Sequence, residues 1–118
     1  MEQIQIAQLP FDDLKFDEEG LIPVVVTEYQ TNELLMLAYM NKESLLQSIA
    51  LKEMVFYSRS RQTLWHKGAT SGNVLKIHHI LVNCYENSLQ AKVSIQGNQV
   101  ACHTGEKTCF YRKLNIKN

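Results

Sequence analysis

Short apolar runs bounded by turn residues constrain the fold of this chain more than any other feature. Five runs are rich in branched aliphatic and aromatic residues, and they span Leu21–Tyr29, Leu34–Tyr39, Met54–Ser58, Val74–Cys84 and Leu89–Ile95. Runs of this length and composition are typical of strands. The turn residues 30–32 separate the first two runs, so we predict a hairpin there. Pro23 indicates an edge or entry position in the first strand.

One segment has helical rather than strand character. Asn41 is suited to cap a short helix over residues 41–52, with Glu43 in its first turn. Four apolar residues are spaced to share one face of that helix, namely Leu45, Leu46, Ile49 and Ala50. The sequence therefore predicts an α+β fold, with a mainly antiparallel β-sheet and one or two short helices.

Composition narrows the class of protein. The chain has 118 residues, of which 45% are hydrophobic, so we predict a single domain over residues 1–118. The formal net charge is zero, which argues against a nucleic-acid partner and weakly favours self-association. No apolar run is long enough to span a bilayer, and Met1–Phe16 lacks the features of a signal peptide. We therefore expect a soluble cytoplasmic protein with no membrane partner.

Three cysteines are an odd number for a disulfide framework. In a reducing compartment they indicate a metal site or reactive thiols, and the alternative is that they are small buried hydrophobic residues. Cys102 and Cys109 lie in a polar segment with a central glycine, a reasonable geometry for zinc, and Cys84 would be the third ligand. Three protein ligands and an open position are typical of catalytic zinc. His103 could be a fourth ligand or a catalytic base.

Residues 59–72 concentrate positive charge, hydroxyl groups and glycines in an otherwise neutral protein, and we predict that they are mostly loop. Arginine and lysine bind phosphate, and glycines allow backbone N–H groups to approach an anion. The predicted substrate-binding residues are Arg59, Ser60, Arg61, Trp65, Lys67, Gly68, Thr70 and Ser71. The alternative is an ordinary solvated loop, with Trp65 filling the core.

His78 and His79 are adjacent on a predicted strand, so we expect them to face opposite ways and to share no metal.

Several segments together carry a resemblance to a known family. They are Leu21–Val26, Leu35–Asn41, Phe56–Arg61, Leu64–Gly68 with Thr70–Gly72, and Ala101–Gly105 continuing through Cys109–Phe110. In this order they resemble the phosphoribosyl-AMP cyclohydrolase family of histidine biosynthesis, over roughly residues 11 to 112. The segment around Trp65 and the run from Cys102 to Gly105 are specific to that family.

The resemblance implies a homodimer with zinc sites shared between subunits. Cys84 would come from one subunit, and Cys102 and Cys109 from the other. It also implies a reaction, in which water opens the N1–C6 bond of the adenine ring in N1-(5-phosphoribosyl)-AMP. That nucleotide carries two phosphate groups, for which the basic loop offers partners.

The sequence departs from the family around Cys84. The family's magnesium site is an Asp-Cys-Asp-x-Asp run, and here the residues are Asn83-Cys84-Tyr85-Glu86-Asn87. The acidic residue expected after Lys67-Gly68 is replaced by Ala69. Magnesium prefers anionic oxygen ligands, so these replacements alter its site. The three cysteines that would bind zinc are kept. Three interpretations follow: the cyclohydrolase itself, a paralogue that hydrolyses a related nucleotide or heterocycle with zinc alone, or a non-catalytic zinc-containing dimer that binds a nucleotide.

Overall fold

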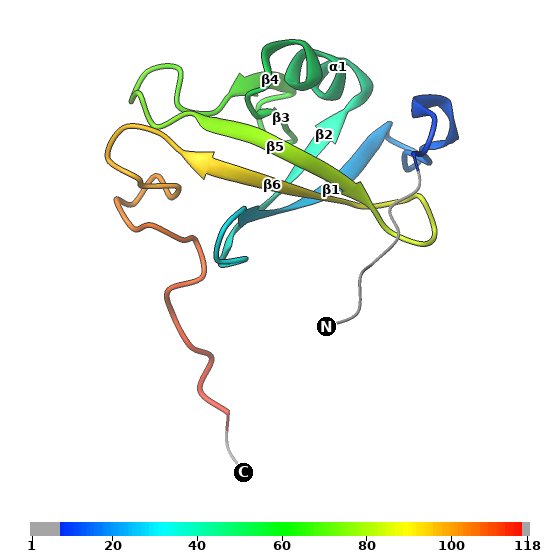
Figure 1. Ribbon diagram of the computed structural model, residues 1–118. Coiled ribbons are helices and arrows are strands. Elements are labelled where there is room, and N and C mark those ends of the chain that lie inside the picture. The colour runs from blue at the N-terminus through cyan, green and yellow to red at the C-terminus, as the bar shows by residue number, and fades with distance from the viewer. Residues whose placement is uncertain (1–7, 117–118) are drawn as a thin grey trace.

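The computed structural model describes residues 8–116 (Figure 1). Its elements in chain order are the 3-10 helix η1 (Phe11–Asp13), β1 (Leu21–Glu28), β2 (Leu34–Asn41), α1 (Lys42–Leu51), β3 (Val55–Ser58), β4 (Thr63–His66), β5 (Leu75–Val82) and β6 (Leu89–Ile95). The predicted α+β class is confirmed. The predicted domain also includes residues 1–7 and 117–118, which lie outside the described residues. Within residues 8–116, no helix combines the length and apolarity needed to cross a bilayer.

Four strands form the main sheet, in the order β2-β1-β6-β5. The pairs β1–β2 and β5–β6 are antiparallel, which confirms the predicted hairpin, and β1–β6 is parallel. Pro23 belongs to an inner strand, but the pairing of β1 with β6 begins only at Val24. The proline therefore occupies the entry position that the sequence predicted, where its missing N–H costs no ladder bond.

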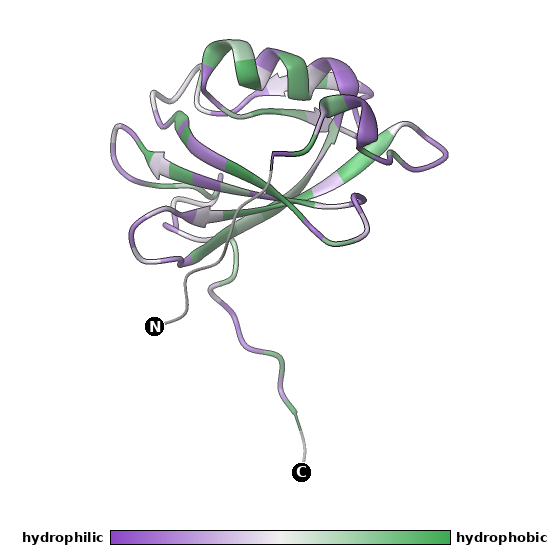
Figure 2. Cartoon of the chain, turned by 45° about the vertical axis from the view of Figure 1, so that its right-hand side comes forward, coloured by the Kyte–Doolittle hydropathy of each residue, from purple (hydrophilic) through white to green (hydrophobic). Residues whose placement is uncertain are grey.

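One face of the sheet is covered and the other is open. Helix α1 and the β3–β4 hairpin lie over the same face, as Figures 1 and 2 show. Beneath them the core is built from alternate residues of β1 and β6, including Ile22, Val24 and Val93. On the opposite face Val25 and Leu37 are paired across β1 and β2 and remain 37% and 52% exposed. The face opposite α1 therefore presents apolar side chains to solvent.

The start of α1 agrees with the sequence prediction, but its buried face does not. The Asn41 side chain accepts a hydrogen bond from the Ser44 N–H at 2.8 Å, and the Ser44 hydroxyl accepts one from the Asn41 N–H at 2.9 Å. Of the four apolar residues that the spacing placed on one face only Leu45 is buried, while Leu46 and Ile49 are about half exposed. Ser44 and Ser48 take the inward positions because their hydroxyls bond to backbone groups inside the fold.

Residues 59–72 are mostly loop, as predicted, but they include the short strand β4, which the sequence did not predict. Thr63–His66 pairs antiparallel with β3, and the Phe56 and Trp65 rings lie 5.6 Å apart. A mixed polar strand that pairs only within a hairpin has too little apolar alternation to be recognised from sequence.

His78 and His79 lie on β5, where the pairing register shifts between Ile77 and His79. Because of this irregularity, the two histidines do not follow the strict alternation of side chains that the sequence predicted.

Candidate active site

A tight loop after β6 brings Cys102 and Cys109 together. The Ala101 N–H donates to the Lys107 carbonyl at 3.1 Å, and the Cys102 N–H donates to the Glu106 carbonyl at 3.0 Å. Gly105 makes the reversal with a φ of 94°, a conformation that favours glycine. The predicted glycine-containing loop is therefore a closed, hydrogen-bonded structure.

The loop is anchored on the free edge of β2. The Cys109 N–H donates to the Leu35 carbonyl at 2.7 Å, and the Thr108 hydroxyl donates to the Leu34 carbonyl at 2.6 Å. An ion pair of 2.9 Å joins Lys107 to Glu33. Because these contacts reach a strand far away in the sequence, the position of the two cysteines is fixed by the sheet.

The two thiols have different acidities. The Thr104 hydroxyl donates to Cys102 Sγ at 3.0 Å, and this bond is the main reason that the pKa of Cys102 is lowered. Burial raises the pKa of Cys109 to about 11, and a hydrogen bond with Cys102 acts in the same direction. Without a metal, Cys102 is therefore the more acidic of the two thiols. This pairing places two soft sulfur donors side by side.

A hollow of about 560 Å³ joins this loop to the segment after β4. It is lined by the predicted residues Trp65, Lys67, Gly68, Thr70, Ser71, Cys102 and His103. Two motifs that lie more than thirty positions apart in the sequence thus form one site. The hollow contains a thiol, an imidazole, hydroxyls and an aromatic ring within a single concave surface.

Lys67 lies inside the site rather than on its rim. The residue is only 7% exposed, and its ammonium group is 5.3 Å from the Trp65 ring centroid. Burial lowers the pKa of Lys67, while the charges of Cys109 and Cys102 oppose that shift. The lysine therefore supplies positive charge next to the thiols as well as to the hollow.

The structure does not bring Arg59, Ser60 and Arg61 to the hollow. They form the β3–β4 turn, where the Arg59 guanidinium lies 4.0 Å from the Tyr39 ring centroid. The Arg61 N–H donates to the Ser58 hydroxyl at 3.3 Å. Tyr39 alternates with the core-facing Met40, which puts Arg59 on the open side of the sheet.

Cys84 is remote from the other two cysteines within one chain. It lies in the turn between β5 and β6, whereas the loop of Cys102 follows the other end of β6 (Figure 1). The seven residues of β6 span roughly 20 Å. Among residues 8–116, no group of three or more His, Cys, Asp or Glu side chains is placed to hold a metal ion. A three-thiol site therefore requires a second copy of the chain, with Cys84 exposed to meet it.

The residues around Cys84 do not fit magnesium. Asn83 Nδ2 donates to Asn87 Oδ1 at 2.6 Å, and Asn83 Oδ1 accepts the N–H groups of Asn87 and Ser88. Both amides are thus used to close the turn. Tyr85 is 70% exposed and offers only a neutral phenol. Glu86 is the single carboxylate of the turn, and it lies 3.5 Å from the Lys15 ammonium group. Since magnesium prefers several anionic oxygen ligands, these residues fit it poorly.

One pair of residues beside the hollow was missed from the sequence. His66 also lines it, and His66 Nε2 lies 2.8 Å from Glu53 Oε1. Glu53 precedes β3, thirteen positions earlier, so no local spacing signals the pair. Knowledge of the β3–β4 hairpin would have been needed to find it.

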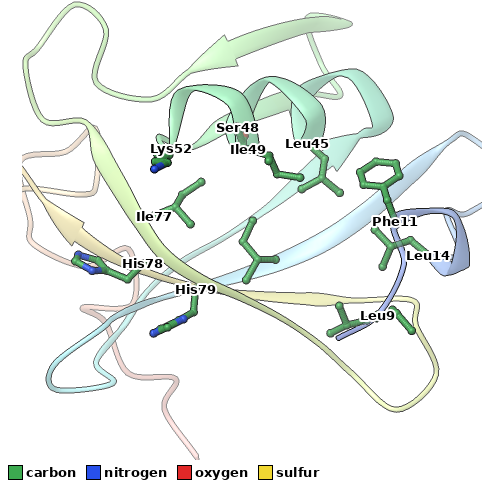
Figure 3. Close-up of a pocket in the computed structure, with 12 residues that line it drawn as sticks. Leu9, Phe11, Leu14, Leu45, Ser48, Ile49, Lys52, Ile77, His78 and His79 are labelled. Carbon is green, nitrogen blue, oxygen red and sulfur yellow. The ribbon is translucent and has the colours of Figure 1, made fainter. Parts of the chain in front are cut away.

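A second hollow, of about 500 Å³, lies between α1 and β5 and is mainly apolar (Figure 3). Leu45, Ile49 and Ile77 point into it, and His78 and His79 stand at one end. It contains none of the predicted site residues. The candidate active site is therefore the hollow between the β4–β5 segment and the cysteine loop.

Comparison with known proteins identifies the family. The family model of phosphoribosyl-AMP cyclohydrolase matches residues 36–111. Phosphoribosyl-AMP cyclohydrolase of Cupriavidus taiwanensis is 47% identical over 86% of this chain and 75% of its own length. The enzyme of that name from Chlorobium phaeobacteroides is also 47% identical, over 87% and 74%. Histidine biosynthesis bifunctional protein HisIE of Caldanaerobacter subterraneus is 50% identical over 87% of this chain and 49% of its own. The chain belongs to the phosphoribosyl-AMP cyclohydrolase family.

Proposed function

We propose that this protein hydrolyses the adenine ring of N1-(5-phosphoribosyl)-AMP between N1 and C6, as a step in histidine biosynthesis. The observation that carries the proposal is the hollow in which the Trp65–Ser71 segment meets Cys102 and His103. The names of the relatives support the same reaction. The donors in the hollow suit a hydrolysis in which water is activated and a nucleotide is held.

The proposed cofactor is zinc, held by Cys102 and Cys109 of one copy and Cys84 of another. The support is the soft donor pair within one loop and the exposure of Cys84 in the turn at the opposite end of β6. Zinc supplies Lewis acidity, which makes water a competent nucleophile near neutral pH. The Lys67 ammonium offsets part of the negative charge that three thiolates would bring together.

The segment from Trp65 to Ser71 is proposed to hold the nucleotide. Trp65 is 42% exposed and offers a ring face on which a purine can stack. The hydroxyls of Thr70 and Ser71 line the same hollow and can donate to phosphate oxygens. Gly68 lines the same hollow, and its φ of 84° is a conformation that favours glycine.

His103 is proposed to take the proton that water loses. It is exposed and lines the hollow directly beside Cys102. The water oxygen bonds to C6, the C6–N1 bond breaks with its electrons going to N1, and the proton is returned to the opened ring. C6 thereby becomes a carboxamide, and N1 stays attached to its ribosyl group. His103 acts as general base in this scheme rather than as a metal ligand.

Magnesium has no part in this proposal, because Glu86 is the single carboxylate of the Asn83–Asn87 turn and both asparagine side chains are used to close it. The same turn favours one alternative, in which the protein is a paralogue that acts on a related nucleotide or heterocycle with zinc alone. Turnover of N1-(5-phosphoribosyl)-AMP by purified protein, with and without added magnesium, separates the two. Turnover that is independent of magnesium supports the proposal, and absence of turnover by zinc-loaded protein contradicts it.

The shared site is tested by mixing two inactive variants. Cys84→Ala and Cys102→Ala each remove one side of the proposed site. A mixed dimer carries one intact site and one doubly damaged site, so mixing should restore both zinc binding and turnover. Mixtures that stay as inactive as the separate variants would show that the three cysteines do not meet across two copies.

A further inference from the structure

The C-terminal arm, residues 110–116, exposes large apolar side chains to solvent. Phe110, Tyr111, Leu114 and Ile116 are 54%, 44%, 86% and 73% exposed. Among the residues described, no hydrogen bond joins 111–116 to the rest of the fold. In extended backbone Phe110, Leu114 and Ile116 would share one face, which Arg112 interrupts, while Lys113 and Asn115 would lie on the other face. The arm is thus built to pack on something outside its own chain.

The arm leaves the molecule on the open side of the sheet. In Figures 1 and 2 it runs away from the side that carries α1. On this same open side a hollow of about 410 Å³ is formed where β5, β6 and β1 meet. Val25, which is 37% exposed, and Leu81 supply its apolar wall on the open face, and Gln90 pairs with both. Val82 and Leu89 line it from the core side, and Asn83 marks its end. We refer to it as the β5–β6 hollow.

Chain connectivity relates the arm to the β5–β6 hollow of a second copy. The arm begins directly after Cys109, and the hollow ends directly before Cys84. If the two sulfurs bind one zinc, each at about 2.3 Å, they lie roughly 4 Å apart. Phe110 is only about 3.8 Å further along the backbone than Cys109. Under the shared zinc site proposed above, the start of each arm therefore lies at the mouth of the other copy's β5–β6 hollow.

Charge complementarity favours the same contact. The segment before β1 carries five exposed acidic residues, Asp12, Asp13, Asp17, Glu18 and Glu19. It is held against the Cys84 turn, since the Lys15 N–H donates to the Glu86 carbonyl at 2.8 Å. The arm instead carries Arg112 and Lys113, in a chain whose net charge is zero. The basic arm of one copy is therefore attracted to the acidic segment of the other, and this attraction can act in both directions at once between two copies.

We propose that each copy of the chain docks its C-terminal arm on the open sheet face of the other, with Phe110 entering the β5–β6 hollow. The occupant is a second copy, and the exchange is symmetric because each copy has one arm and one hollow. The inference rests on the shared zinc site and adds a surface that holds the two halves of that site in register. The arm thus helps to position the active site and takes no direct part in the reaction.

The first test compares two double variants. Leu114→Asp with Ile116→Asp places charge on the arm, where both side chains are already exposed in one chain. The matched control is Leu46→Asp with Ile49→Asp, which changes two half-exposed apolar residues on α1, away from the open face. Sedimentation velocity over a dilution series should show the dimer dissociation constant raised roughly tenfold or more by the arm variant only. Equal dissociation constants for the arm variant and the wild type would overturn the proposal.

A second test locates the contact. The photoreactive residue p-benzoylphenylalanine replaces Phe110, and isotopically light and heavy copies are mixed so that links between copies are distinguished by mass. Cross-links between copies should fall within residues 81–90. Cross-links confined to one chain, or reaching α1 of the other copy, would contradict the arm exchange.

The cysteine complementation experiment separates failure of the arm from failure of the shared site. Restored zinc binding in mixed dimers, together with unchanged dimerisation of the arm variant, leaves the shared site standing and removes the arm. Failed complementation removes the shared site, and the arm proposal falls with it. Restored zinc binding together with weakened dimerisation of the arm variant supports both.

Discussion

The Thr104 hydroxyl donates a hydrogen bond of 3.0 Å to Cys102 Sγ, two residues earlier in the same turn. This bond stabilises the thiolate and is the largest contribution to the lowered pKa of Cys102. Thr104→Val keeps the shape of the side chain but removes the donor. In metal-free protein the variant should raise the pKa of Cys102 toward its ordinary value of 9.0 or above it.

The measurement is the rate of Cys102 alkylation as a function of pH, resolved by mass spectrometry. Because the thiolate is the reactive form, the rate below pH 9 should fall in Thr104→Val, and the midpoint should move to higher pH. The control is Thr70→Val. Thr70 lines the same hollow, and within residues 8–116 it makes no hydrogen bond to either thiol. A Thr104→Val profile that overlays the wild-type profile would show that the bond does not set the acidity.

Gly68 should tolerate no larger side chain. Its φ is 84°, and a Cβ built there would lie 2.3 Å from Asn73 C and Val74 N, which are backbone atoms. Gly72 has nearly the same φ, 83°, but a Cβ there meets nothing within 4 Å. Gly72→Ala should cost about 1–3 kcal/mol from backbone strain alone.

Gly68→Ala adds the steric clash to that strain and should be clearly more destabilising than Gly72→Ala. The difference between the two free energies of unfolding, measured in urea, isolates the clash. Equal destabilisation by both variants would mean that the segment after β4 relaxes freely, and would weaken the assignment of Gly68 to a rigid wall of the site.

Ser48 is a buried polar link between α1 and β3. Its hydroxyl donates to the Ser44 carbonyl at 2.8 Å and accepts from the Val55 N–H at 2.8 Å. Ser48→Ala would leave that N–H without a partner in the core, at a cost of about 1–3 kcal/mol. The exposed Ser60→Ala is the control and should change stability by less than about 0.5 kcal/mol. Thermal and urea unfolding of both variants provide the check.

We still predict that Arg59 and Arg61, in the β3–β4 turn, bind phosphate. They lie outside the hollow of their own chain, with Arg59 on the open side of the sheet. Arg59→Ala and Arg61→Ala should each weaken AMP binding by roughly tenfold and leave zinc content unchanged, since charge-assisted bonds to phosphate are strong. Lys52→Ala, at the C-terminus of α1, removes an equal charge elsewhere. Titration calorimetry in which Arg59→Ala binds AMP as tightly as Lys52→Ala would remove these arginines from the site.

Local patterns in the sequence were sufficient to predict most strands, the N-terminal cap of α1 and the two motifs that form the hollow. These patterns did not predict the burial or pairing of a side chain whose contacts come from residues distant in the sequence. Ser48 is buried because β3 offers backbone groups to it, and periodicity alone favoured Ile49 instead. Likewise the pairing of His66 with Glu53 depends on how β3 meets β4, which no spacing encodes.

The anchoring of the cysteine loop on β2 has a consequence for the behaviour of the metal-free protein. Strand β2 ends the main sheet, and edge strands with free carbonyls tend to recruit strands of other molecules. Thr108 and Cys109 occupy the carbonyls of Leu34 and Leu35 at that edge. A ligand that holds the cysteine loop in place thereby also shields the edge, so depletion of zinc should promote aggregation through β2 as well as loss of activity.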